Sequence, residues 1–145
     1  MEPSRDIQLP LAALRSRLSA RAAGIWEVSG DRLEQVAFDA ALDMPSEVAN
    51  RFADATRSVD LARLDLGIVK AAATGRVVVS VADDLPADTG SGYWLRAFGA
   101  TRSVAAPIVG PGGHITLVVS VALGPEPDAE TVAAMLRQEF DLSEE

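Results

Sequence analysis

Two short glycine-containing turns constrain the fold of this 145-residue chain more than any other feature. One turn is Ser29-Gly30-Asp31, and the other is Gly-Pro-Gly-Gly at residues 110–113. Each turn separates two apolar segments, and strands joined by so few residues can pair only in antiparallel fashion. The sequence therefore predicts two β-hairpins, with strands at 25–28 and 33–40 and at 103–109 and 114–123.

Further elements precede, separate and follow these hairpins. A β-branched run at residues 77–81 predicts a buried strand. A first helix is predicted to begin near Pro10, with Leu11, Leu14 and Leu18 on its apolar face. Other helices are predicted from Ser46 towards Arg57, at 61–74 before Gly75, at 91–98 before Gly99, and from Asp128, with Val132, Met135, Leu136 and Phe140 on one face. This order predicts an α+β domain with a central antiparallel sheet.

The composition favours one soluble globular domain. With 48% hydrophobic and 23% charged residues, wholesale disorder is excluded. The net charge of −8 and the absence of a basic run argue against nucleic-acid binding. We find no signal peptide and no apolar run near the ~20 residues of a membrane helix, so we expect a cytoplasmic protein without membrane contact. We expect a flexible N-terminus at 1–8, one domain at 9–141 and an acidic tail at 142–145.

One segment carries a family-like pattern. A helix ending in Thr74-Gly75 precedes the apolar strand, and after a loop a second helix ends on Gly99. A Ser-Val-x-x-Pro-Ile strand follows at residues 103–108, and paired glycines precede the last strand. This pattern resembles GAF domains, to which PAS domains are similar. The resemblance implies that the terminal helices cover one face of the sheet, and that the middle helices and loops cover a small-molecule pocket on the other.

The resemblance also implies a function. GAF domains usually sense or regulate, so we expect a small-molecule-binding module that acts in signalling through a separate protein. The alternative is a ligand-free dimerisation or docking module, whose pocket is filled by its own side chains. An isologous homodimer through the terminal helices is the expected assembly, because such dimers are the commonest closed oligomers.

The chain also departs from several GAF proteins. It has no cysteine, which members that attach bilins or reduce free methionine sulfoxide require, and it lacks the Asn-Lys-Phe-Asp-Glu signature of cyclic-nucleotide members. The single histidine, His114, follows the glycines of a hairpin turn and has no metal-ligand spacing around it. No nucleophile-elbow motif is present. We therefore expect no enzyme, no metal site and no resident cofactor.

The predicted short helix at 91–98 supplies the first candidate ligand-binding residues. Ser91 and Gly92 lie at its start, where free backbone N–H groups favour an anion and a glycine lets a ligand approach. Alternatively, Ser91 only caps its own helix. Trp94 is expected either in the pocket wall or in the core, and Arg96 either beside an anion or in solvent.

The last predicted strand supplies two further candidates because its faces differ. Thr116 and Ser120 alternate with apolar residues and share the smaller, more polar face, which suits a pocket. Alternatively, both hydroxyls bond to backbone in a tightly packed layer. Phe38 and Trp26 on the first hairpin are expected in the pocket or in the core. The opposite face of the last strand is expected against helices and contains Ile115, Leu117, Val119, Val121 and Leu123.

Overall fold

The computed structural model describes residues 3–140, and both predicted hairpins are present in it. In chain order the elements are α1 (Pro3–Arg17), β1 (Ala22–Ser29), β2 (Arg32–Ala40), α2 (Ser46–Ala55), β3 (Ser58–Asp60), α3 (Gly67–Thr74), β4 (Val78–Val81), the 3-10 helix η1 (Ala82–Asp84), α4 (Gly90–Phe98), β5 (Arg102–Val109), β6 (Ile115–Leu123) and α5 (Ala129–Phe140). Within this part of the chain, no helix has the length and apolar character needed to cross a bilayer. The predicted acidic tail at 142–145 lies outside the described residues.

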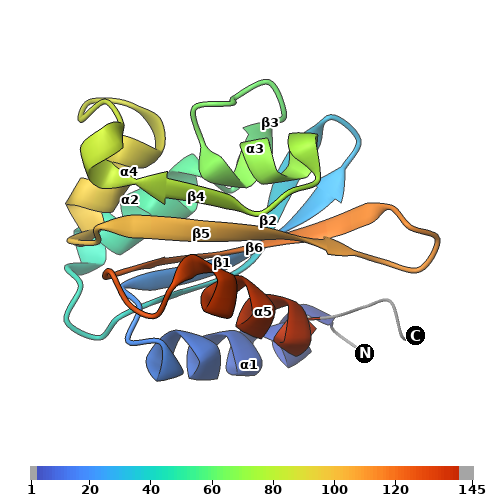
Figure 1. Cartoon of the computed structure of the whole chain (residues 1–145), viewed down its shortest axis with the longest axis horizontal. Helices are drawn as coiled ribbons and strands as arrows, with labels where there is room; N and C mark the ends of the chain where they lie inside the picture. Colours follow the sequence, from blue (N-terminus) through green and yellow to red (C-terminus); the bar gives the residue numbers. More distant parts are fainter. Residues whose placement is uncertain (1–2, 141–145) are drawn as a thin grey trace.

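The strands form one antiparallel sheet in the order β3-β2-β1-β6-β5-β4. The two hairpins meet where β1 pairs with β6, and β3 and β4 form the edges. Helices α1 and α5 cover one face, whereas α2, α3 and α4 lie over the other (Figure 1). The predicted α+β fold with a central antiparallel sheet is confirmed.

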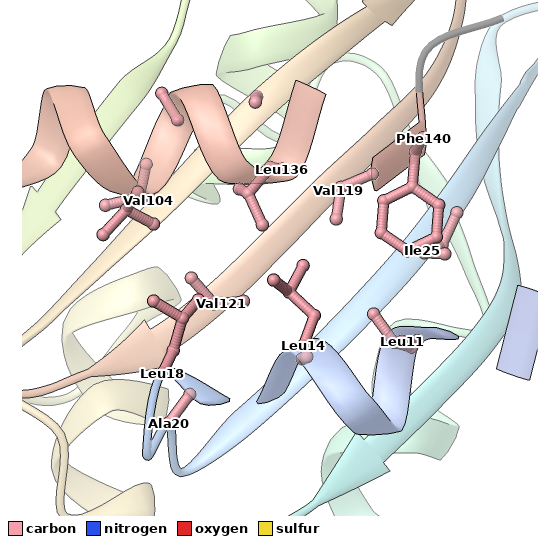
Figure 2. Packing of buried hydrophobic residues seen from close by; sticks show 14 of the residues in the cluster. Leu11, Leu14, Leu18, Ala20, Ile25, Val104, Val119, Val121, Leu136 and Phe140 are labelled. Carbon is pink, nitrogen blue, oxygen red and sulfur yellow. The ribbon is translucent and has the colours of Figure 1, made fainter. Parts of the chain in front are cut away.

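The main core lies between the sheet and the two terminal helices, as Figure 2 shows. Leu14 of α1 and Leu136 of α5 are both fully buried there. The sheet contributes alternate residues of β6, which confirms the face predicted for that strand except at Ile115, where the pairing with β5 shifts register. Each such buried side chain stabilises the fold by about 1.5–3 kcal/mol. The members from β6 are Leu117, Val119, Val121 and Leu123.

Helix α1 begins earlier than predicted. It starts at Pro3 rather than near Pro10, so residues 3–8, predicted to be flexible, lie in this helix. Ile7 packs against the main core, and the Gln8 side-chain amide donates a hydrogen bond to the Phe38 carbonyl oxygen at 3.2 Å. These contacts hold the segment before Pro10 against the sheet, although a proline inside a helix removes one backbone hydrogen bond.

The predicted helix at 61–74 is only half right. Helix α3 begins at Gly67, and the preceding residues form turns, in which the Asp60 carboxylate accepts the Ala62 N–H at 2.8 Å. Leu64, which fitted the helical spacing, is 57% exposed. The unpredicted strand β3 pairs with β2 just before these turns.

Strand β4 is an edge strand and not the buried strand that was predicted. Val79 and Val81 are 43% and 36% exposed, whereas Val78 and Ser80 face α3 and α4. A run of valines predicts a strand equally well at the edge or the centre of a sheet, because the β-branched preference concerns the pleated surface itself.

Candidate ligand-binding site

A small, half-enclosed cavity lies between the sheet and helices α3 and α4. Its volume is about 50 Å³. The roof comes from α3 and α4, including Gly67, Ser91 and Trp94, and Phe52 of α2 contributes from the side. The floor comes from the sheet and includes Ser103, Ser120 and Ala122.

Small residues on four neighbouring strands leave room for this cavity. Ser120 lies between Gly24 of β1 and Ala105 of β5, and the next row contains Ala22, Ala122, Ser103 and Ser80. Gly24 is required for a second reason. A Cβ atom on it would lie 2.4 Å from the indole ring of Trp26, which therefore rests directly on the sheet.

An aromatic cluster closes one side of the cavity, and Phe52 is its centre. The ring of Phe52 lies 5.1 Å from that of Trp94 and 5.0 Å from that of Phe98, both in edge-on geometry. It also contacts Phe38 and Trp26 at 5.3 and 6.1 Å. Edge-on aromatic pairs contribute about 0.5–1.5 kcal/mol beyond their buried area. Sequence reasoning missed Phe52, although it lies on a predicted helix.

The hydroxyls of Ser103 and Ser120 are polar groups of the cavity floor that are open to a ligand. These residues are diagonal neighbours on β5 and β6, and neither hydroxyl makes a hydrogen bond to another described residue. By contrast, the Thr56 hydroxyl donates to the Phe52 carbonyl oxygen and accepts a bond from Gln35. A hydroxyl can both donate and accept, so the two serines suit a small polar group.

Ser91 lines the cavity, but its bonds differ from both readings of the sequence. Its hydroxyl accepts the N–H of Gly67 at 2.9 Å, and its own N–H donates to the Asp65 carbonyl oxygen at 3.0 Å. The N-cap of α4 is Thr89, without a side-chain capping bond. Ser91 thus ties the start of α4 to the start of α3, and the anion site predicted at its N–H is filled by Asp65.

Gly92 and Arg96, two other predicted site residues, hold the loop before α4. Gly92 is buried, and a Cβ atom there would lie 2.0 Å from the Pro86 carbonyl oxygen. Arg96 is exposed, and its guanidinium donates to the carbonyl oxygens of Ala82 and Gly92 at 2.7 and 3.1 Å. Arg96 therefore does not reach into the cavity, because main-chain oxygens already accept its bonds.

Of the remaining residues predicted to bind a ligand, some line the cavity and others lie outside it. Trp94 and Ser120 line the cavity. Phe38 lies behind Phe52 and borders a smaller void of about 30 Å³. Thr116 is four residues from Ser120, about 13 Å along the strand, and its hydroxyl donates to the His114 carbonyl oxygen at the hairpin. Three predicted residues, namely Ser91, Trp94 and Ser120, are therefore brought together.

The described residues contain no cluster of three or more metal-binding side chains. His114 is exposed at the β5–β6 hairpin, away from the cavity. No lining residue of the cavity carries a charged side chain. The site therefore suits ligands that hydrogen-bond and pack, and residues 3–140 provide no counter-charge inside it.

A charged pair supports the turn over the cavity. The Arg63 guanidinium donates two hydrogen bonds of 2.9 Å to the Asp65 carboxylate. Chiefly through these bonds, Arg63 holds the pKa of Asp65 below its ordinary value of 3.8. Such a lowered pKa stabilises the fold above the ordinary pKa, and this contribution is lost as the pH falls through the lowered value.

We expect Asp65→Asn to lower the urea midpoint by a constant amount between about pH 5 and 7, where the carboxylate is charged in the folded and unfolded chain. Below pH 3.8 the difference from the wild type shrinks, because the pair is lost as Asp65 is protonated. Asp88→Asn, at an exposed residue with no ion pair to a described residue, is the control. A wild-type advantage that persists unchanged at pH 2 would contradict this role.

Neither a protein-family model nor a curated protein matches the sequence, but solved structures match the fold. One is the type II free methionine-R-sulfoxide reductase of Thermoplasma acidophilum, with a TM-score of 0.64 and 13% identity over 93% of this chain and 84% of that chain. The prediction that the chain is not an enzyme is therefore corrected. An enzyme has this fold, so the fold gives no ground for that exclusion.

Two other solved structures are similar to this chain. The GAF domain/HD domain protein of Geobacter sulfurreducens has a TM-score of 0.69 at 11% identity, over 94% of this chain and 85% of that chain. The NreA protein of Staphylococcus aureus, solved with its nitrate binding site mutated, has a TM-score of 0.60 at 16% identity, over 87% and 95%. The chain therefore has the fold of GAF domains, as the resemblance in its sequence implied.

Proposed function

We propose that this chain binds a polar molecule of a few heavy atoms between the sheet and helices α3 and α4, and that it acts as a sensory or regulatory domain. The observation that carries the proposal is the cavity itself. It has aromatic walls, and its floor carries the two hydroxyls of Ser103 and Ser120, which no described residue uses. Binding sites of this kind combine apolar walls with a few well-placed polar groups.

The size of the cavity limits the ligand. A volume of about 50 Å³ holds roughly four water-sized groups. Nucleotides, bilins and haem are far larger, so we propose a compact ligand such as a small amide, or a small oxoanion or short carboxylate that hydrogen bonds alone would hold, because no charged side chain lines the cavity. The nitrate binding site named for the NreA protein supports a ligand of this size in a domain of this fold.

The strands under the cavity offer a route from the ligand to the terminal helices. On β5, Ser103 faces the cavity and its neighbour Val104 packs in the main core. On β6, Ser120 faces the cavity, and Val119 and Val121 pack in the same core. We propose that ligand-dependent shifts of β5 and β6 are transmitted to α1 and α5, where a separate signalling protein detects them.

A thermal-shift screen tests the proposal. The panel contains nitrate, nitrite, formate, acetate and urea, with AMP as a ligand too large for the cavity. At a hundredfold excess over its Kd, a ligand raises the free energy of unfolding by about 2.7 kcal/mol. We expect one small compound to raise the melting temperature in proportion to log concentration, and AMP to have no effect.

Variants of the floor locate the effect. Ser103→Val with Ser120→Val removes both hydroxyls and fills the space with β-branched side chains that suit strands. We expect this double variant to fold and to lose the response. Ser16→Val with Ser29→Val, at exposed positions, is the matched control and keeps it. A double variant that still responds, or a wild type that responds to nothing in the panel, contradicts the proposal and favours a ligand-free docking module.

A further inference from the structure

The outer edge of strand β4 presents both backbone groups and side chains to solvent. The N–H of Ala82 donates to the Thr101 carbonyl oxygen, so Ala82 points its backbone towards β5. Backbone groups alternate in direction along an antiparallel strand, and those of Val79 and Val81 therefore point away from the sheet. The side chains of the same two valines are exposed. Native proteins usually protect such an edge.

Opposite charges flank the two ends of this edge. At the N-terminal end, Lys70, Arg76 and Thr74 line a shallow surface groove beside Val77 and Val78. At the C-terminal end lie Asp83 and Asp84 of η1. All four of these charged residues are exposed, and none forms an ion pair with another described residue.

We propose that β4 pairs with β4 of a second copy of this chain, so that two sheets join into one across a two-fold axis. The strands run antiparallel in such a pair, with the axis near Ser80. Val79 then lies opposite the partner's Val81, and the two residues exchange backbone hydrogen bonds. Both have backbone groups that point outward from the sheet. The four exposed valines cover one another on the face of the sheet that also carries α5.

The same geometry brings the charges together. With Ser80 on the axis, Arg76 and Lys70 of one copy lie beside the partner's Asp83 and Asp84, and the arrangement is repeated by symmetry. A two-fold interface needs such a self-complementary patch. An unrelated partner would need this basic–valine–acidic order in its own sequence, whereas a second copy supplies it.

The terminal helices, which the sequence led us to expect at a dimer interface, fit a partner less well. Their apolar stripes are buried under the chain's own sheet, including Leu11, Leu14, Val132 and Leu136. Among residues 7–140, α1 and α5 together carry one exposed large hydrophobic side chain, that of Leu9. This observation favours the β4 edge over the helices as the interface between copies.

Sedimentation velocity over a range of protein concentrations tests the proposal. We expect a concentration-dependent dimer that weakens with added salt, because exposed charges are screened. Val79→Lys places like charges across the axis and raises the dimer Kd about tenfold or more. Leu9→Lys, which makes the same change on α1, leaves the Kd unchanged. A wild type that stays monomeric at all concentrations, or a dimer broken by Leu9→Lys and not by Val79→Lys, overturns the proposal.

Charge reversal supplies a second test at exposed residues that the fold does not need. Arg76→Asp alone and the pair Asp83→Lys with Asp84→Lys each place like charges together in the dimer and weaken it. Adding Lys70→Asp to all three changes in one chain restores opposite charges across the axis, and we expect the dimer to return. Failure of this fourfold variant to dimerise, with circular dichroism equal to the wild type, overturns the proposed pairing.

Discussion

Replacing Trp26 by alanine is expected to lower the free energy of unfolding by about 3–5 kcal/mol. The indole is 1% exposed and rests on Gly24, and its Nε1 donates a hydrogen bond of 2.8 Å to the Thr56 carbonyl oxygen. Alanine removes the ring, leaves a large cavity and deprives a buried acceptor of its donor. Equilibrium unfolding in urea, followed by circular dichroism, measures the effect.

Two variants separate the causes. Trp26→Phe keeps an aromatic ring but removes the donor, so we expect a smaller loss, of about 1–3 kcal/mol from the stranded Thr56 carbonyl. Trp94→Ala makes the same change as Trp26→Ala at the half-buried cavity wall and is expected to cost less. If Trp26→Ala were as stable as Trp94→Ala, the packing described around Trp26 would be wrong.

Replacing Gly92 by alanine is expected to cost about 1–3 kcal/mol, although only one methyl group is added. The new Cβ atom would lie 2.0 Å from the Pro86 carbonyl oxygen and 2.9 Å from the Leu85 Cβ. The first of these is a backbone atom, so the loop before α4 must move away from the helix. The loss is measured by urea unfolding.

Gly124→Ala is the matched control for this prediction. Nothing lies within 4 Å of the Cβ position at Gly124, so we expect a change within about 0.5 kcal/mol. Gly92 was predicted to let a ligand approach, whereas the structure places it against the Pro86 backbone. Equal stabilities of Gly92→Ala and Gly124→Ala would argue against that close contact.

The features predicted correctly from the sequence depend on local signals. The hairpin turns are recognisable because glycines bring the strand ends together, and φ is +62° at Gly30 and +94° at Gly112. Gly75 and Gly99 end their helices, as predicted, and both have the left-handed conformation. The stripe on α1 and the alternation on β6 follow from the period of each element.

The errors share a different cause, because they depend on partners distant in the sequence. The short strand β3 exists through its pairing with β2, and no periodicity can develop over three residues. In the sequence Ser91 has the position of a helix cap, but in the fold its hydroxyl bonds to the Gly67 N–H and its N–H bonds to the Asp65 carbonyl oxygen. Likewise, the sequence suggests that the guanidinium of Arg96 could bind an anion, but in the fold it donates a hydrogen bond to the carbonyl oxygen of Ala82.

The candidate site was therefore predicted only in part. Trp94 and Ser120 could be found because one lies on a short aromatic helix and the other on the polar face of a strand. Ser103 begins the strand pattern that resembles GAF domains, but its place beside Ser120 depends on the register of β5 with β6. Phe52 becomes recognisable only when α2 packs over the sheet and brings four other rings around it.

The most direct test of the central claim is a two-dimensional ¹H–¹⁵N spectrum of the labelled protein, recorded while the small compounds are added one at a time. We predict that one compound shifts the indole signal of Trp94 and the amide signals of Gly67, Ser103 and Ser120, with one saturating Kd. If every compound leaves these signals unchanged, or if the shifted signals lie on other parts of the sheet, the cavity between the sheet and helices α3 and α4 is not the ligand site.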